Sequence, residues 1–387
     1  MAASYEVRIY SPAGVALERL LGQSGDGLTN VNAGWLALSY NKGVNEIGSG
    51  AVAINVASGA LDALALDGNA ILDTQVEIWR RDDENSITPY ADFFGFQRDR
   101  FYETDDNGTT TYVAVLQEQS DLLRRGAIEY RANVANRSLF SAVATETILK
   151  TLVTRNATSS GTTADGRDRN VDAWGAFVSV AADTAAGSTQ TLSCMGENLY
   201  EVLQSVANAG GLDFSLVKTG ARAWQFRTAT LLGTDRSTGA SAVTFALQYG
   251  NMRRPSLRSN RQAEKTVVTA GGQGVDTARA IRTRTGANYD ATVNSYELFI
   301  NSSQYTTNAG LDSAADERLE ELRARDSLSF QPIQVPSTLY GKHYFLGDKI
   351  KAFFLGKEYT PQIRRVEISV DAGNAIIENI GMTAADA

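Results

Sequence analysis

The sequence predicts a mainly β protein with a mixed α+β middle, in which antiparallel β-barrel-like lobes and a few short helices form a multidomain architecture. Three observations indicate this class. Short segments alternate apolar and polar residues along most of the chain, helical periodicity appears in three segments, and Gly- and Ser-rich stretches interrupt the pattern. A chain of 387 residues, 43% of them hydrophobic, has enough apolar surface for roughly two to four compact domains.

The first third of the chain has the alternation typical of antiparallel strands. A hairpin is predicted from Asp92–Thr104 and Thr109–Leu116, because Asn107-Gly108 between them is the pair that best supplies the positive φ angles of a tight primed turn. The inward positions of the earlier strands are Tyr5, Val7, Ile9, Val52, Ile54, Val56, Val76 and Ile78.

Helical periodicity predicts three short helices. The first covers Ser141–Arg155, where apolar residues fall on one side. The second covers Glu197–Ala209 and ends at Gly210-Gly211, a natural C-terminal stop. The third covers Leu311–Asp326, with Glu321 and Arg325 as a surface pair near its end.

The rest of the chain returns to strands, and these divide it into three predicted domains. A second hairpin joins Leu212–Leu216 to Trp224–Phe226, and four further strands follow at Thr266–Thr269, Tyr296–Ile300, Lys349–Leu355 and Arg364–Val370. Polar loops at Asn156–Asn170 and Gly233–Ser241 are candidate boundaries. The predicted domains are an N-terminal antiparallel β lobe (residues 1–130), a mixed α+β unit (131–235) and a C-terminal β lobe with one inserted helix (236–387).

Composition argues against most kinds of catalysis. The chain has one histidine, His343, and one cysteine, Cys194, so residues that move protons near neutral pH, bind zinc or act as thiols are scarce. We expect His343 in a turn or at the edge of a core, Cys194 as a small buried apolar residue, and neither a metal nor a cofactor. The formal charge of −8 argues against a general grip on nucleic acid.

No signal peptide and no membrane span are expected. Met1–Tyr10 lacks a basic start followed by an apolar run and instead alternates like a strand. The longest weakly polar stretch, residues 47–61, is interrupted by Gly, Ser and Asn, so it is unsuited to crossing a bilayer.

The sequence matches known nucleotide-binding and catalytic motifs only in part. Gly271-Gly272-Gln273-Gly274 follows a strand but lacks the third glycine and the βαβ context of a dinucleotide site, so we expect a tight turn. Ser39-Tyr40-Asn41-Lys42 has the serine–lysine spacing of some hydrolases without the companion motifs, which favours strand and turn. The acidic clusters Asp82-Asp83-Glu84 and Asp105-Asp106 are predicted turns.

One basic cluster stands out as a candidate contact surface. It consists of Arg253, Arg254, Arg258 and Arg261, and Arg279, Arg282 and Arg284 lie further along. The cluster lacks interleaved aromatic residues for stacking on single-stranded nucleic acid. We therefore expect solvated arginines or contacts with another subunit or a channel, and no catalytic, cofactor or metal residues are assigned.

The order of several segments resembles a known family. After the N-terminal strand come Val76–Arg81 and Phe93–Phe96, Thr145–Val153, Gly196–Leu203 and Gly210–Phe214, Asn251–Gly274 and finally Tyr344–Ile350. Together they resemble the tail-tip or baseplate hub proteins of siphovirus-type bacteriophages.

This resemblance implies a tail-hub-like structural virion protein and no enzyme. Proteins of this kind typically form a homotrimeric ring at the distal end of the tail tube, around the channel for DNA ejection, and adapt the tube to the tip. The implied partners are further copies of the chain, distal tail or tail-tube proteins, the tape-measure protein and tip or fibre proteins, while DNA passes only transiently. The implied location is the virion, after synthesis in the host cytoplasm.

Two alternatives remain open at this point. One is a carbohydrate- or receptor-binding β module of a virion or cell surface, which would use exposed aromatic residues such as Trp79 or Trp224. The other is a glycan hydrolase that uses two of the many carboxylates, because such chemistry needs only two acids at the right separation.

Overall fold

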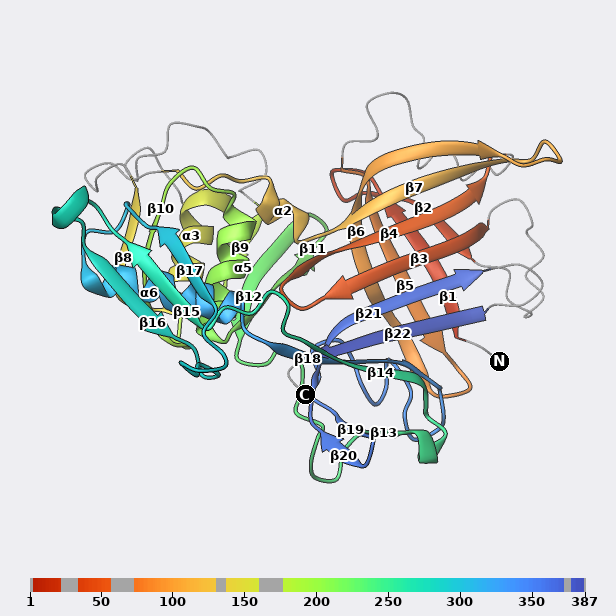
Figure 1. Ribbon diagram of the computed structural model, residues 1–387. Coiled ribbons are helices and arrows are strands. Elements are labelled where there is room, and N and C mark those ends of the chain that lie inside the picture. Colours follow the sequence, from red (N-terminus) through yellow and green to blue (C-terminus); the bar gives the residue numbers. More distant parts are fainter. Residues whose placement is uncertain are drawn as a thin grey trace. The chain divides into compact units, whose positions relative to one another are not determined.

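The computed structural model describes residues 3–21, 34–56, 73–129, 137–159, 177–371 and 377–385 (Figure 1). These residues form two compact units, each built from discontinuous parts of the chain. The first unit contains Met1–Asp121, Gly233–Leu257 and Ser327–Ala387. The second contains Leu122–Leu232 and Arg258–Asp326.

An open sheet of eleven strands dominates the first unit (Figure 1). In spatial order it contains β14 (Met252–Asn260), β18 (Arg325–Pro332), β22 (Ile377–Ala385), β21 (Gln362–Asp371), β3 (Trp35–Gly43), β4 (Glu46–Asn55), β7 (Thr110–Glu118), β6 (Ile87–Thr104), β5 (Gln75–Asp82), β1 (Ser4–Tyr10) and β2 (Ala16–Leu21). A small sheet of β13 (Thr244–Ala246), β19 (Lys351–Phe354) and β20 (Lys357–Tyr359) accompanies it.

The sheet combines strands from both ends of the sequence. β3 pairs with β21 in antiparallel register, with Tyr40 opposite Ile368. The predicted mainly antiparallel β class is confirmed, but the predicted barrel-like form is not, because β14 and β2 stand at opposite ends of the large sheet and no sheet among the described residues closes on itself. A barrel requires its first and last strands to pair.

The core of the first unit lies on one face of the large sheet. The alternating residues Tyr5, Val7 and Ile9 of β1 are buried, as are Val52 and Ile54 of β4. They pack with side chains from the last third of the chain, including Ile368 and Val370. Each fully buried aliphatic side chain of this kind contributes about 1.5–3 kcal/mol to folding.

The predicted hairpin is confirmed as β6 and β7, but its turn has a different form. Thr104 pairs with Thr110, and Asp105 N–H donates to Thr109 O (3.0 Å), which leaves a three-residue loop. Gly108 is left-handed (φ 81°) and Asn107 is not. The Asp105 carboxylate accepts the N–H groups of Asn107 (2.9 Å) and Thr109 (2.8 Å), so the aspartate fixes the wider loop.

Among the described residues, three helices of more than ten residues and three small sheets form the second unit. The helices are α3 (Thr145–Ala157), α5 (Leu199–Gly210) and α6 (Asn308–Glu321), with the single turn α2 (Asp121–Arg124) at the unit's start. The sheets contain β8 (Ser138–Ala144) and β10 (Thr189–Cys194); β11 (Asp213–Gly220), β12 (Ala223–Ala229) and β9 (Val178–Val180); and β16 (Ile281–Thr285), β15 (Val267–Gly271) and β17 (Glu297–Asn301).

The three predicted helices exist, with shifted ends. α5 begins after Asn198, whose side chain accepts the N–H of Tyr200 (3.0 Å), and ends before Gly211 in the left-handed region. The first helix begins at Thr145 because Ser141–Ala144 pairs with β10 as the end of β8. In α6, Glu321 pairs with Arg318, and the side chain of Arg325 lies outside the described residues.

The predicted boundary at Gly233–Ser241 begins directly after Leu232, where the first of the two segments of the second unit ends. Most of the predicted loop Asn156–Asn170 lies outside the described residues. The predicted division into domains at residues 1–130, 131–235 and 236–387 stays a prediction.

Candidate assembly surface

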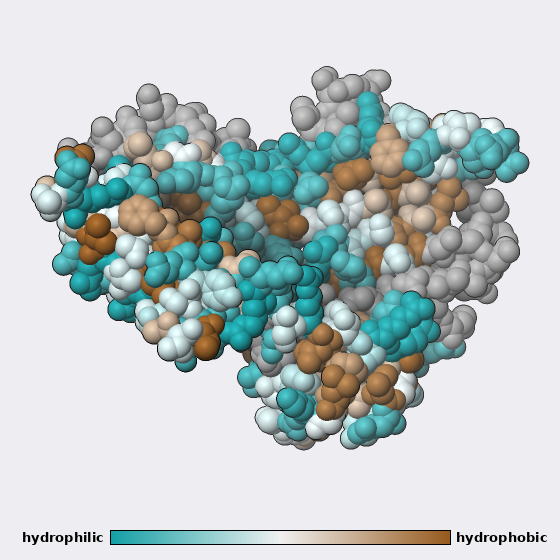
Figure 2. Space-filling view, viewed as in Figure 1, coloured by the Kyte–Doolittle hydropathy of each residue, from teal (hydrophilic) through white to brown (hydrophobic). Residues whose placement is uncertain are grey.

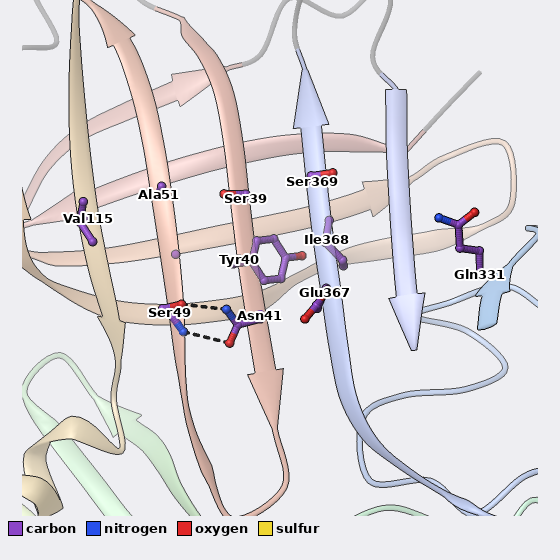
Figure 3. A pocket seen from close by; sticks show the side chains of 11 residues that line it. Ser39, Tyr40, Asn41, Ser49, Ala51, Val115, Gln331, Glu367, Ile368 and Ser369 are labelled. Atoms are coloured by element: carbon purple, nitrogen blue, oxygen red, sulfur yellow. Dashed lines mark hydrogen bonds between the residues drawn. The ribbon is translucent and has the colours of Figure 1, made fainter. Parts of the chain in front are cut away.

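A hollow lies on the face of the large sheet opposite the apolar core, across β4, β3 and β21 (Figure 3). Its volume is about 560 Å³. Two cross-strand rows form most of its floor. Ser369, Ser39, Ala51 and Val115 make one row, and Glu367, Asn41 and Ser49 make the other. Gln331 of β18 also lines it.

Side-chain size explains why the sheet is hollowed here. Alternation directs Leu38 and Tyr40 of β3 into the core, so Ser39 and Asn41 face the other side. Serines and alanines project little, which leaves space above the strands. Asn41 Nδ2 donates to Ser49 Oγ (2.7 Å), and Ser49 N–H donates to Asn41 Oδ1 (3.3 Å), so this pair is held rigid.

The chemistry of the hollow suits contact rather than bond breaking. Its lining offers hydroxyl and amide groups and the exposed carboxylate of Glu367, which Arg365 Nε contacts at 2.8 Å. Tyr40 also lines it, but its hydroxyl is buried and donates to Asp92 Oδ2 (2.6 Å). Burial and the nearby Asp92 raise the pKa of Tyr40 well above its ordinary value, so this hydroxyl stays protonated.

A buried polar cluster lies on the core side of the large sheet. Asp92 accepts hydrogen bonds from Tyr40, from Tyr340 (2.9 Å) and from the ammonium of Lys42. Arg80 donates to the backbone oxygen of Tyr340 (2.9 Å). This network joins parts of the chain that lie far apart in the sequence. Because Asp92 and Tyr340 are almost fully buried, it offers no access to a substrate.

The structure divides the predicted basic cluster. Arg253 and Arg254 are exposed in the first unit, and Arg253 Nη2 lies 3.4 Å from Gln331 Oε1 at the hollow. Arg258 is exposed in the second unit, and Arg261 pairs there with the buried carboxylate of Glu264 (2.9 Å). Their role as subunit or channel contacts stays a prediction. The hollow carried no signal in the sequence apart from the small residues of its strands.

The structure places three other predicted positions in turns or in the core. His343 Nδ1 accepts the N–H of Leu339 (3.0 Å) in a turn, as expected. Cys194 is buried, which raises the pKa of its thiol to about 12. Asp82 accepts the backbone N–H of Asn85 (3.1 Å), which confirms a turn at the first acidic cluster.

The aromatic side chains considered for glycan binding are poorly placed for it. Trp224 is only 3% exposed, which contradicts the expectation of an exposed ring. Trp79 is half-buried, and the guanidinium of Arg8 lies 3.7 Å from its ring centroid. Within the described part of the chain, no three His, Cys, Asp or Glu residues gather as a metal site, and no helix is both long and apolar enough to span a membrane.

Comparison with solved structures identifies the fold. The 43 kDa tail protein of prophage MuSo2 from Shewanella oneidensis superposes with a TM-score of 0.57 at 14% identity, over 98% of both chains. A tail protein from Neisseria meningitidis MC58 gives 0.56 at 12%, over 99% of this chain and 96% of the other. A chain of the half-lidded Francisella PdpA–VgrG complex gives 0.53 at 9%, over 100% of this chain and 58% of the other.

Sequence comparison identifies the family. Curated protein sequences gave no significant match. The family model described as Siphovirus ReqiPepy6 Gp37-like protein matches residues 25–380, which is nearly the whole sequence. The chain therefore belongs to the Siphovirus ReqiPepy6 Gp37-like protein family.

Proposed function

We propose that this chain is a phage tail protein and serves as a structural hub of the tail tip or baseplate, in which three copies form a ring at the distal end of the tail tube. The observation that carries the proposal is the shared fold: two tail proteins, one of them from a prophage, match this chain over nearly their whole lengths. The proposed ring surrounds the path of DNA and adapts the tube to the tip.

The large sheet supplies a means of closing a ring. Its end strands, β2 and β14, each leave one edge unpaired in the described part of the chain. Because the two edges differ, joining β14 of one copy to β2 of the next is a head-to-tail contact, which closes into a ring when the rotation permits. Exposed arginines on β14 (Arg253, Arg254) and Glu18 on β2 supply opposite charges to this contact.

The proposed partners follow from this position. Distal tail or tail-tube proteins lie above the ring, tip or fibre proteins below it, and the tape-measure protein within the tube. The hollow on the large sheet offers a neighbouring protein a recessed surface of small polar side chains and one carboxylate. The net charge of −8 suits a conduit that lets DNA pass without holding it.

Mass measurement and imaging test the proposal. Light scattering of the purified chain should give three times the monomer mass, and a labelled chain should lie at the distal end of the tail in electron micrographs of virions. The Arg253→Glu variant should weaken the trimer, whereas Lys357→Glu, which alters an exposed lysine on β20, should not. A label located along the tube or in the capsid would refute the hub assignment.

A further inference from the structure

We propose that residues 258–326 form a module that separates from the rest of the second unit when Glu317 loses its proton. The module contains the sheet β16-β15-β17 and α6, and the rest of the unit consists of residues 122–232. The separation takes place within one copy of the chain, so the inference goes beyond the proposed ring and holds whether or not that ring forms.

The module has a hydrophobic core of its own. Two residues of β15 and three of α6 are buried together: Val268, Ala270, Leu311, Ala315 and Leu319. α6 therefore covers one face of the sheet, and Figure 2 shows hydrophilic side chains among hydrophobic ones over the same sheet. Since all the side chains of this cluster belong to residues 258–326, the core can stay intact when the module moves.

Two neighbouring strands hold the ends of the module. Its first residues complete β14 and its last residues begin β18, and these strands are neighbours in the large sheet. Both connections of the module therefore leave through one pair of strands. A hinge at the ends of these strands lets the module turn without a change in either core.

The module contacts residues 122–232 where α6 packs on α5 and β10. Hydrogen bonds cross this contact at three places: Ser205 Oγ donates to the Glu317 carboxylate, Ser193 N–H donates to the Tyr305 hydroxyl (3.4 Å), and Arg137 Nη1 donates to Gln304 O (3.2 Å). The last two distances lie at or beyond the upper end of the usual range for N–H···O bonds, so these two bonds hold the module weakly.

Glu317 makes this contact sensitive to pH. Its side chain is half-buried, and burial raises the pKa of its carboxyl above the ordinary value of 4.5. The hydrogen bond from Ser205 lowers this pKa, the charge of Glu321 raises it, and the charge of Arg318 lowers it. The net shift is upward, so the contact favours the protonated carboxyl.

Two buried groups beside Glu317 also resist ionisation. Burial and the charges of Glu197 and Glu317 raise the pKa of the Cys194 thiol to about 12, although Arg137 opposes the shift. Burial and the charge of Glu317 raise the pKa of Tyr305 to about 12 as well. Both groups are neutral near pH 7, so they do not balance a negative charge on Glu317.

The arginines around α6 bind other carboxylates. Arg318 pairs with Glu321, and on the β16 side Arg282 pairs with Asp312 (2.9 Å) and Arg284 with Asp316 (2.8 Å). Since their charges are shared with these partners, an ionised Glu317 is stabilised best by water. Water reaches it when α6 leaves α5.

Loss of the proton therefore favours separation. The pKa of Glu317 is raised while the module is docked and returns toward 4.5 when the carboxyl is hydrated. Between these two values the docked form holds a proton that the separated form releases. Docking is strongest at and below pH 4.5, weakens as pH rises through the raised pKa, and is level above it.

The single cysteine of the chain can report the separation. Cys194 is buried at the contact, so dithiodipyridine, which labels thiols at acidic and at neutral pH, should reach it when the module has separated. The labelling rate then follows the population of the open form. Measuring two variants at the same pH cancels the pH dependence of the thiol itself.

At pH 8, Glu317→Gln should be labelled at least about threefold more slowly than the natural chain, because glutamine keeps the neutral state of the docked carboxyl. At pH 5 the two rates should differ less. Glu320→Gln is the matched control, because it removes a carboxylate of the same helix that pairs with Arg323 (2.6 Å), and its rate should equal that of the natural chain.

Two results would overturn the inference. One is equal or faster labelling of Glu317→Gln at pH 8. The other is a labelling rate that rises with urea as steeply as global unfolding does, because separation exposes far less surface than unfolding. If Glu317→Gln fails to fold by circular dichroism, Ser205→Ala replaces it. Its labelling rate should rise at least about threefold at pH 8 and less at pH 5, and an equal change at both pH values refutes the module.

Discussion

At the scale of single residues, Glu118 at the end of β7 makes folding sensitive to pH. Burial raises the pKa of its carboxyl to about 7, although hydrogen bonds from Ser120 and Gly48 and the charge of Lys42 oppose the shift. The folded protein therefore holds a proton between pH 4.5 and about 7 that the unfolded chain releases. Stability falls as pH rises through this window and is level above it.

Replacing Glu118 with glutamine should remove this pH dependence. We expect Glu118→Gln to be more stable than the natural chain at pH 8 by about 1–3 kcal/mol and to differ little at pH 5, because each pKa unit corresponds to about 1.4 kcal/mol. Urea unfolding at the two pH values measures the difference. Glu103→Gln, at an exposed position of β6, is the control. A variant that is destabilised equally at both pH values would contradict the assignment.

At this scale, the sequence predicts the surroundings of some residues but not of others. Cys194 and His343 were predicted correctly, because composition and neighbouring residues indicate a lone buried thiol and a turn. No sequence feature indicated the buried role of Asp92, a residue of β6 whose side chain bonds to Lys42 and Tyr340. An aspartate that ends a polar stretch resembles any turn residue, and its burial depends on a segment about 250 residues later in the chain.

At the scale of elements, the turn of the β6–β7 hairpin depends on Gly108. Its φ of 81° is costly for residues with a Cβ atom, and no atom lies within 4 Å of where that Cβ would stand. Gly108→Ala should therefore destabilise the protein through its backbone conformation and not through a steric clash, and we expect the free energy of unfolding to fall by about 1 kcal/mol. Thermal unfolding measures it. Gly108→Asn should lose less, because asparagine tolerates left-handed backbone. Equal losses in both variants would contradict this account.

The elements themselves were largely predictable, and their ends were not. Alternation in β1 and the 3.6-residue period of α5 both reflect burial on one face, which local sequence records. The start of α3 was misplaced because Ser141–Ala144 has a partner strand, β10, about 50 residues away. The primed turn was wrong because the Asp105 side chain takes two backbone N–H groups and stabilises a wider loop.

At the scale of the whole molecule, the combination of both ends of the chain in one sheet was beyond sequence reasoning. Alternation predicts that β3 and β21 each have a buried face, but many strands share that property. What selects the pair is the packing of Leu38 and Tyr40 with Ile368 and Val370 in a common core, which exists only after folding. The hollow could not be predicted for the same reason, because its rows consist of residues from four strands.

This arrangement predicts that a C-terminal truncation damages the N-terminal strands. Removing residues 362–387 deletes β21 and β22, and it leaves β3 with one unpaired edge and the core without Ile363, Val366, Ile368 and Val370. Hydrogen exchange should accelerate by orders of magnitude in β3 and β4, because their local stability depends on that packing. Amides of α3 and α5 should stay protected, since the second unit has its own contacts. Removing residues 386–387 alone should change neither, whereas equal acceleration in both units would show that they fold as one.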